Sequence, residues 1–336
     1  MQDIRRHLAP LSLMLLVVVI TSRSAAGDLA LPIVSLEQFV ILGFVLLVNL
    51  LHFLFVAVLA SMVRARHFQN PTTRQVDVRA LWASLTVNPV VCSLAVVGLF
   101  VGVTACGNLV EIYRTRSGVW HDAALWNLEQ ELFAVLLASP LNVPAFWDAV
   151  YFMVWSGLFV GSSLLFVTGQ KSRFFLLITA LVWAFVLTRV TAIYFPTQGP
   201  VFFMPEKFHL SGTISANTQR ALALYMASQI PQNGMLPGTM AMPSLHVGMP
   251  FLVTCLLARA LPRTLWLTVP WFLLNWASTV FLGWHYAVDG VGGIAIALAA
   301  LGLAWIQQRA WDSAFGGTST ASPSSRPTSL TRRAPQ

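Results

Sequence analysis

Two stretches in the C-terminal third of the chain decide the fold: GTMAMPSLHVGMPF at residues 238–251 and STVFLGWHYAVDGVGG at residues 278–293. The first carries His246 and the second carries His285 and Asp289, each at the rim of a strongly apolar segment. Ionisable groups are costly beside lipid hydrocarbon, so their presence there indicates a functional site. A short turn around Pro262 lies between the two stretches. It predicts an antiparallel helical hairpin that returns both histidines to the same membrane face.

The composition extends the membrane interpretation to the whole chain. Of the 336 residues, 57% are hydrophobic and 10% are charged, whereas a soluble domain carries roughly 25% charged residues. Apolar segments that approximate the ~20 residues needed to cross a bilayer lie at residues 36–63, 81–106, 149–168, 174–195, 247–261, 264–282 and 290–306. Backbone groups must be satisfied internally within lipid, so each segment is expected to be a helix. The predicted fold is an all-α integral membrane bundle of about seven transmembrane helices.

The N-terminus allows two interpretations. Arg5 and Arg6 precede a short apolar run at residues 8–20, and the small residues 24–26 follow, a pattern typical of a cleaved signal peptide. An uncleaved first helix is the alternative. The predicted organisation is residues 1–26 as signal peptide or first helix, 27–118 as N-terminal transmembrane helices, 119–308 as a catalytic membrane domain and 309–336 as a disordered tail. Two shorter helices are expected, an interfacial amphipathic one at 125–137 and another at 216–230.

The charged residues predict the orientation of the helices. Lys and Arg gather in alternate loops, which the positive-inside rule places in the cytoplasm, while the acidic residues fall mainly in the other loops. Both histidines are then on the extracytoplasmic face of a multi-pass plasma membrane protein, and the C-terminal tail is cytoplasmic. The formal net charge of +8 is spread over short loops. Nucleic-acid binding would need a clustered basic stripe, so no nucleic-acid partner is expected.

The spacing of the ionisable residues points to a type of chemistry. If residues 285–289 are helical, Asp289 lies one turn after His285 and can accept its imidazole N–H. Such a contact would hold the tautomer, as the Asp of a Ser-His-Asp triad does. Two facing histidines suit phosphoryl transfer, in which one attacks phosphorus and the other protonates the leaving oxygen. Ser244 is expected either to cap the helix that begins after it or to bind phosphate at that helix terminus.

These motifs carry a family resemblance. MPSLHVG followed by GWHYAVDGVGG resembles the type 2 phosphatidic acid phosphatase superfamily, whose second and third motifs carry PSGH and H-x-x-x-D. Within it, the Leu of PSLH and the HYxVD form resemble the inositol phosphorylceramide synthase branch. The resemblance covers roughly residues 126–306. It implies that His285 is the nucleophile, Asp289 its orienting group and His246 the general acid, with Ser244 in a phosphate cradle on the outer face.

The resemblance also implies an activity. The chain is expected to be a membrane lipid phosphatase or phosphotransferase that acts through a phosphohistidine intermediate. Its substrate is expected to be a lipid phosphate or a phospholipid taken from the bilayer. A transferase would pass a headgroup of the inositol phosphate type to a lipid or polyol hydroxyl. No cofactor and no metal are expected.

The chain departs from the family pattern at the phosphate site. The superfamily has a Ser-Arg pair seven and six residues before the third-motif His, whereas this chain has Ser278 and Thr279 there. Ser278 is retained as a predicted substrate-binding residue. Arg189, near the outer end of the fourth apolar segment, is expected to supply the missing cation. Lys207 and Arg220 are weaker candidates, and snorkelling to the interface is the alternative role for Arg189.

Other interpretations stay open at this point. Two His and one Asp could ligate zinc or iron, and a non-enzymatic transporter or assembly protein could retain the fold. Trp284 and Tyr286 flank the predicted nucleophile. They are expected either to anchor the chain at the membrane interface or to line a headgroup pocket.

Overall fold

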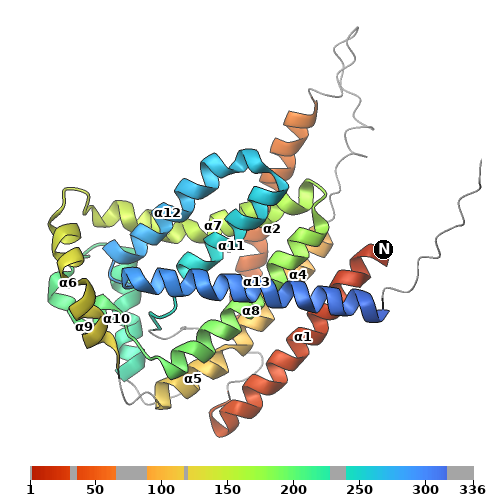
Figure 1. Cartoon of the computed structure of the whole chain (residues 1–336). Coiled ribbons are helices and arrows are strands. Elements are labelled where there is room, and N and C mark those ends of the chain that lie inside the picture. Colours follow the sequence, from red (N-terminus) through yellow and green to blue (C-terminus); the bar gives the residue numbers. More distant parts are fainter. Residues whose placement is uncertain (1, 31–35, 66–88, 117–119, 228–239, 316–336) are drawn as a thin grey trace, which may run out of the picture.

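The structure, a computed structural model, describes residues 2–30, 36–65, 89–116, 120–227 and 240–315 (Figure 1). Throughout these ranges the regular secondary structure is helical. The longer helices are α1 (Gln2–Ala26), α2 (Leu36–Ala65), α4 (Pro89–Ala105), α5 (Gly107–Arg116), α7 (Pro144–Val167), α8 (Lys171–Tyr194), α11 (Leu245–Ala260), α12 (Leu265–Phe281) and α13 (Ala287–Phe315).

The described residues contain six candidate spans that are long and apolar enough to cross a membrane. Five lie in α1, α2, α7, α8 and α13, and the sixth, at residues 90–110, runs from α4 into α5. Helices α11 and α12 are shorter, with 16 and 17 residues, and the 3₁₀ turn η3 (Pro262–Thr264) joins them as a hairpin. The predicted all-α, multi-pass membrane fold is therefore confirmed. Residues 81–88 of the second expected segment and residues 316–336 of the expected tail lie outside the described residues. Residues 309–315, which were expected to begin a disordered tail, continue helix α13 instead.

The N-terminal helix is longer than the expected apolar run. Residues 8–20 alone are short for a span, but α1 continues to Ala26 and provides an apolar stretch at residues 7–26. Its buried side chains Leu11, Met14 and Val18 belong to the main hydrophobic core of the bundle. Helix α1 packs against α4, α5, α8 and α13. Whether residues 1–26 are cleaved remains an open prediction.

Helix α8 is the central element of the bundle. It packs against α4, α5, α7, α11 and α13, and α13 runs across it in Figure 1. Its side chains are buried on more than one face, as shown by Phe174, Leu177, Ala180 and Val182. An apolar helix with neighbours all round is a core helix rather than a lipid-facing one. Helix α8 therefore fixes the positions of the helices that carry the predicted catalytic residues.

Helices α11 and α13 approach each other closely through glycine. A Cβ atom on Gly293 would overlap the Ser244 carbonyl oxygen, and one on Gly248 would lie 2.8 Å from the Gly293 carbonyl oxygen. Small residues allow this close backbone contact between membrane helices. The crossing places the first turn of α11, with His246, beside the first turn of α13, with Asp289.

A layer of short elements covers the end of the bundle where α11 and α13 begin. It contains α6 (Asp122–Ala138), α9 (Pro200–Phe203), the 3₁₀ turn η2 (Pro205–Lys207) and α10 (Ile214–Ala227), at the left in Figure 1. A second hydrophobic cluster, which includes Phe133, Trp147 and Phe281, joins this layer to the bundle. The helices expected at 125–137 and 216–230 are confirmed as α6 and α10, although residues 228–230 lie outside the described residues.

Candidate active site

The first histidine lies in the opening turn of α11. The Ser244 N–H donates to the Asp289 carbonyl oxygen at 2.9 Å, and the helix begins at the next residue, which places His246 in its first turn. Ser244 occupies the N-cap position, as expected, but its side chain makes no capping hydrogen bond. The Ser244 hydroxyl is fully buried and has no hydrogen-bond partner among the described residues. Its role in a phosphate cradle remains a prediction.

The second histidine lies in a tight turn rather than in a helix. Helix α12 ends at Phe281 and α13 begins at Ala287, and the N–H groups of Trp284 and His285 both donate to the Thr279 carbonyl oxygen. The condition for a shared helical face, a helix over residues 285–289, is therefore not met. Turn geometry brings them together instead, with His285 Nδ1 3.6 Å from Asp289 Oδ2.

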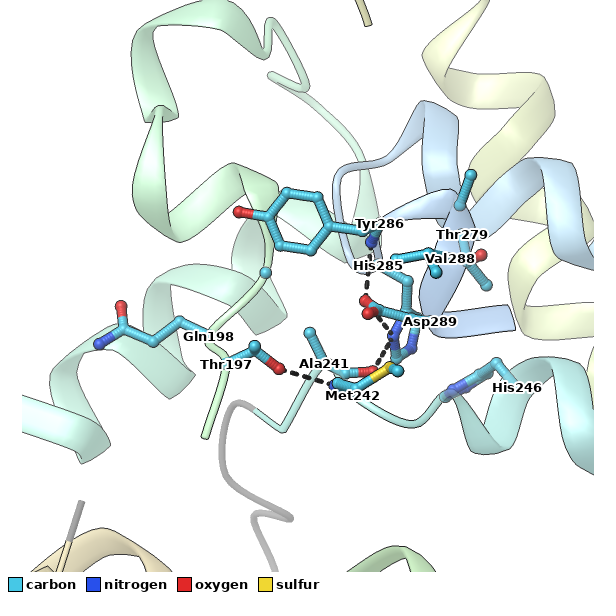
Figure 2. Close-up of polar contacts among 12 residues, drawn as sticks. Thr197, Gln198, Ala241, Met242, His246, Thr279, His285, Tyr286, Val288 and Asp289 are labelled. Carbon is cyan, nitrogen blue, oxygen red and sulfur yellow. Dashed lines mark hydrogen bonds and ion pairs between the residues drawn. The ribbon is translucent and has the colours of Figure 1, made fainter. Parts of the chain in front are cut away.

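A backbone carbonyl makes the shorter contact with the His285 ring. His285 Nδ1 lies 2.6 Å from the Ala241 carbonyl oxygen, and a dashed line marks this contact in Figure 2. A carbonyl oxygen only accepts hydrogen bonds, so Nδ1 carries the proton, and the neutral ring keeps its lone pair on Nε2. Asp289 Oδ2 accepts the Tyr286 N–H at 2.7 Å. The tautomer that a nucleophilic His285 needs is therefore held mainly by Ala241.

His246 faces His285 across a gap and rests on an aromatic stack. The centroids of the two imidazole rings are 6.1 Å apart. Tyr151, from α7, stacks on the His246 ring with centroids 4.3 Å apart, and its hydroxyl lies 3.4 Å from His246 Nδ1. Trp284 stacks on Tyr151 at 5.5 Å. The sequence indicated both histidines, but it gave no sign that a tyrosine within an apolar span would contact one of them.

Both histidines line one cavity of about 240 Å³. Its wall is mostly apolar and aromatic, and the aromatic residues that contribute to it are Tyr151, Phe152, Trp155, Phe185, Phe202 and Trp284. Thr218 and Leu222 of α10 also contribute. A small polar centre within an apolar wall is typical of a site for an amphipathic ligand.

The predicted phosphate-binding residues separate into two groups. Arg189 is buried, lines the cavity, and places its Nη1 atom 2.9 Å from Met240 Sδ. Ser278 and Thr279 are buried in α12, where their hydroxyls donate to the carbonyls of Asn275 and Trp276, and neither lines the cavity. Lys207 and Arg220 also lie off its wall. Substrate binding by Arg189 and Ser278 stays a prediction, and the geometry favours only Arg189.

Three buried carboxylates of the outer region each accept two backbone N–H groups. Asp122 accepts from Gln198 and Gly199, Glu129 from Ala287 and Val288, and Asp148 from Ile214 and Ser215. The last two pairs begin α13 and α10, where N–H groups lack partners within the helix and the helix dipole favours a negative charge. Burial raises the pKa of the Glu129 carboxyl, and its two N–H partners oppose that shift. The sequence indicated these residues only as outer-loop charges.

The two aromatic neighbours of His285 point in different directions. Trp284 lines the cavity, as one of the two expectations had it. Tyr286 is fully buried away from the cavity, and its hydroxyl donates to Asp122 Oδ1 at 3.2 Å. Burial raises the pKa of the Tyr286 phenol, which keeps it a proton donor to that carboxylate. The expectation that Tyr286 lines a pocket is wrong, because its ring packs against Phe133 instead.

The sequence profile of the PAP2 superfamily matches residues 120–303, more than half of the chain. The chain belongs to the PAP2 superfamily. The matched region begins just before α6 and ends within α13, so it contains both histidines, Asp289 and every residue of the cavity wall. Membership indicates a membrane protein of the lipid phosphatase type. No curated protein and no solved structure matches the chain.

Metal-ligand residues do not cluster in the part of the chain that the structure describes. Within it, no group of three or more His, Cys, Asp or Glu side chains is arranged to hold a metal ion. Cys92, Cys106 and Cys255 are separate free thiols.

Proposed function

We propose that this PAP2 protein is a lipid phosphatase or phosphotransferase in which His285 forms a phosphohistidine. One observation carries the proposal: His285 and His246 line the same cavity with ring centroids 6.1 Å apart, and the His285 tautomer leaves Nε2 with a lone pair. That separation suits a tetrahedral phosphoryl group held between a nucleophile and a general acid. The apolar cavity wall supports a substrate with a lipid chain.

In the first step, the Nε2 lone pair of His285 forms a bond to phosphorus, and the ester bond from phosphorus to the leaving oxygen breaks. His246 donates a proton to that oxygen. Positive charge develops on the His285 ring, and the Asp289 carboxylate, 3.6 Å from Nδ1, offsets it. Arg189 is the proposed partner of the phosphoryl oxygens, because it is the one Lys or Arg on the cavity wall within the described chain.

In the second step, an acceptor hydroxyl gives its proton to His246 and attacks phosphorus. The bond from phosphorus to nitrogen then breaks and frees His285. Water as acceptor makes the enzyme a phosphatase, and a polyol or lipid hydroxyl makes it a phosphotransferase. The resemblance of PSLH and HYxVD to the inositol phosphorylceramide synthase branch supports the transferase.

The proposal also includes the membrane that holds the protein and its orientation in that membrane. The alternating loop charges support a plasma membrane protein with its cavity at the extracytoplasmic face and its C-terminus in the cytoplasm. In that orientation the substrate enters from the outer leaflet, and soluble acceptors reach the cavity from outside.

The test is product analysis with purified protein. A lipid phosphate labelled on phosphorus is supplied with a chelator, with and without an alcohol acceptor such as inositol. We expect His285→Ala and His246→Ala to lose at least a hundredfold in rate, while His209→Ala, an exposed histidine off the cavity wall, keeps the wild-type rate.

Each other outcome has a defined meaning. Release of inorganic phosphate alone identifies a phosphatase, and label in the alcohol identifies a transferase. Full activity of His285→Ala would contradict the proposal. Loss of activity with chelator and recovery with zinc would favour a metal site. A folded protein inactive on every lipid phosphate would favour a transporter or assembly protein.

A further inference from the structure

We propose that Thr197 is a positioning residue for the nucleophile, acting through the Ala241 carbonyl to keep the proton of His285 on Nδ1. The inference rests on the proposed function, because it takes His285 as the nucleophile. It assigns a role to the segment between α8 and α9, which carries no catalytic residue.

Thr197 holds the chain on both sides of the Ala241 carbonyl. Its own carbonyl oxygen accepts the Ala241 N–H at 3.0 Å, and its hydroxyl oxygen accepts the Met242 N–H at 2.8 Å. The Ala241 carbonyl lies between these two N–H groups in the chain, so both bonds fix its direction. It is then aimed at His285 Nδ1, 2.6 Å away (Figure 2). Thr197 is fully buried, so water does not compete for these bonds.

The segment that carries Thr197 is itself fixed to the turn that carries His285. The carboxylate of Asp122 accepts the N–H groups of Gln198 and Gly199, each at 2.9 Å. Gly199 has φ +109°, and a Cβ atom there would lie 2.6 Å from the Trp284 carbonyl oxygen. Only glycine fits both that conformation and that close approach. The hydrogen bonds to Asp122 and the close approach of Gly199 to the Trp284 carbonyl therefore hold Thr197 at a fixed distance from His285.

Asp289 alone does not keep the proton of His285 on Nδ1. Its Oδ2 atom lies 3.6 Å from His285 Nδ1, beyond hydrogen-bond distance, and accepts the Tyr286 N–H at 2.7 Å. The two partners of the ring thus have different roles. The Ala241 carbonyl selects the tautomer, and the Asp289 carboxylate offsets the charge of the phosphorylated ring. A His285 with its proton on Nε2 has no lone pair on that atom to attack phosphorus, so loss of the carbonyl's alignment lowers the rate of the first step.

The kinetic test compares Thr197→Val, Thr197→Ser and Thr254→Val. Valine keeps the shape but removes the acceptor for the Met242 N–H, and serine retains it. We expect Thr197→Val to lower kcat on the order of tenfold to a hundredfold, as loss of a group that orients a functional histidine does, with little change in KM because Thr197 is off the cavity wall. Thr197→Ser should recover to within a few-fold. Thr254→Val removes a buried hydroxyl that bonds the Thr268 carbonyl far along α11, and should match wild type.

The tautomer is measured directly by ¹⁵N NMR of histidine-labelled protein, with the His285 signals assigned by their loss in His285→Ala. We expect the Nδ1–H form in wild type and Thr197→Ser, and a mixture of both tautomers in Thr197→Val. An Nε2–H ring in wild type would overturn the inference even if Thr197→Val fails to fold. So would a folded Thr197→Val with wild-type kcat. Full activity of His285→Ala would overturn the proposed function itself, which this readout does not depend on.

Discussion

The membrane bundle and the outer layer position the same site by different physical means. In the bundle, α11 and α13 meet through Gly248 and Gly293, where the absence of side chains lets two backbones touch. At the outer layer, Glu129 of α6 holds the start of α13, and Asp148, from the outer end of α7, holds the start of α10, each through a pair of charged hydrogen bonds. The bundle brings helices together where side chains are absent, and the outer layer holds helix starts with buried carboxylates.

The difference follows from the surroundings of each region. Lipid is as apolar as the helices, so helices in it associate by close packing rather than by the hydrophobic effect. The outer layer instead contains chain reversals and helix starts whose N–H groups need acceptors. Buried carboxylates supply these acceptors and fix direction as well as distance. We therefore expect substitutions in the bundle to damage folding first, and substitutions in the outer layer to damage alignment of the site.

The largest effect is expected in the bundle, from Gly293→Ala. The added methyl overlaps the Ser244 carbonyl oxygen, and neither backbone can move without separating α11 from α13. We expect a loss of about 3 kcal/mol in the free energy of unfolding, at the upper end for overpacking, together with nearly complete loss of activity. Thermal unfolding in detergent measures the loss of stability. Gly302→Ala on the same helix, where a Cβ meets nothing within 4 Å, is the control. Equal stability of the two variants would contradict the account of the crossing.

A smaller effect is expected from Glu129→Gln in the outer layer. The amide can accept one of the two N–H groups at the start of α13, but it presents its NH₂ to the other and leaves a buried donor unpaired. That costs about 1–3 kcal/mol and disturbs the turn that carries His285, so kcat should fall several-fold. Glu131→Gln, an exposed residue of the same helix, is the matched control. Equal stability and equal kcat of the two variants would contradict a positioning role for the Glu129 carboxylate.

The smallest effect on catalysis is expected from Asp148→Asn. It too leaves one donor unpaired, but the helix that it holds, α10, contributes Thr218 and Leu222 to the cavity wall and neither histidine. We expect KM for a lipid substrate to rise a few-fold with kcat nearly unchanged. Steady-state kinetics separates the two constants. A fall in kcat larger than that of Glu129→Gln would reverse the assigned roles.

The sequence predicted the parts of the molecule that depend on local pattern. The lengths of the apolar segments predicted the helices, and the spacing across the hairpin predicted that His246 and His285 meet. Contacts that depend on tertiary structure could not be predicted from the sequence. The Ala241 carbonyl is a backbone atom with no side-chain signal, and Tyr151 comes from a helix about a hundred residues away in the chain. The approach of His285 to Asp289 was predicted for a helix over residues 285–289, and a turn produces it instead, because a four-residue spacing fits a turn as well as a helix.

The most direct test of the central claim is to trap the phosphorylated residue. Wild-type protein is mixed with a lipid phosphate labelled on phosphorus, quenched in base, where phosphohistidine survives, and digested for mass spectrometry. The account predicts an acid-labile phosphoryl group on His285 in wild type and none in His285→Ala. A label on any other residue, or undiminished turnover by His285→Ala, would contradict it.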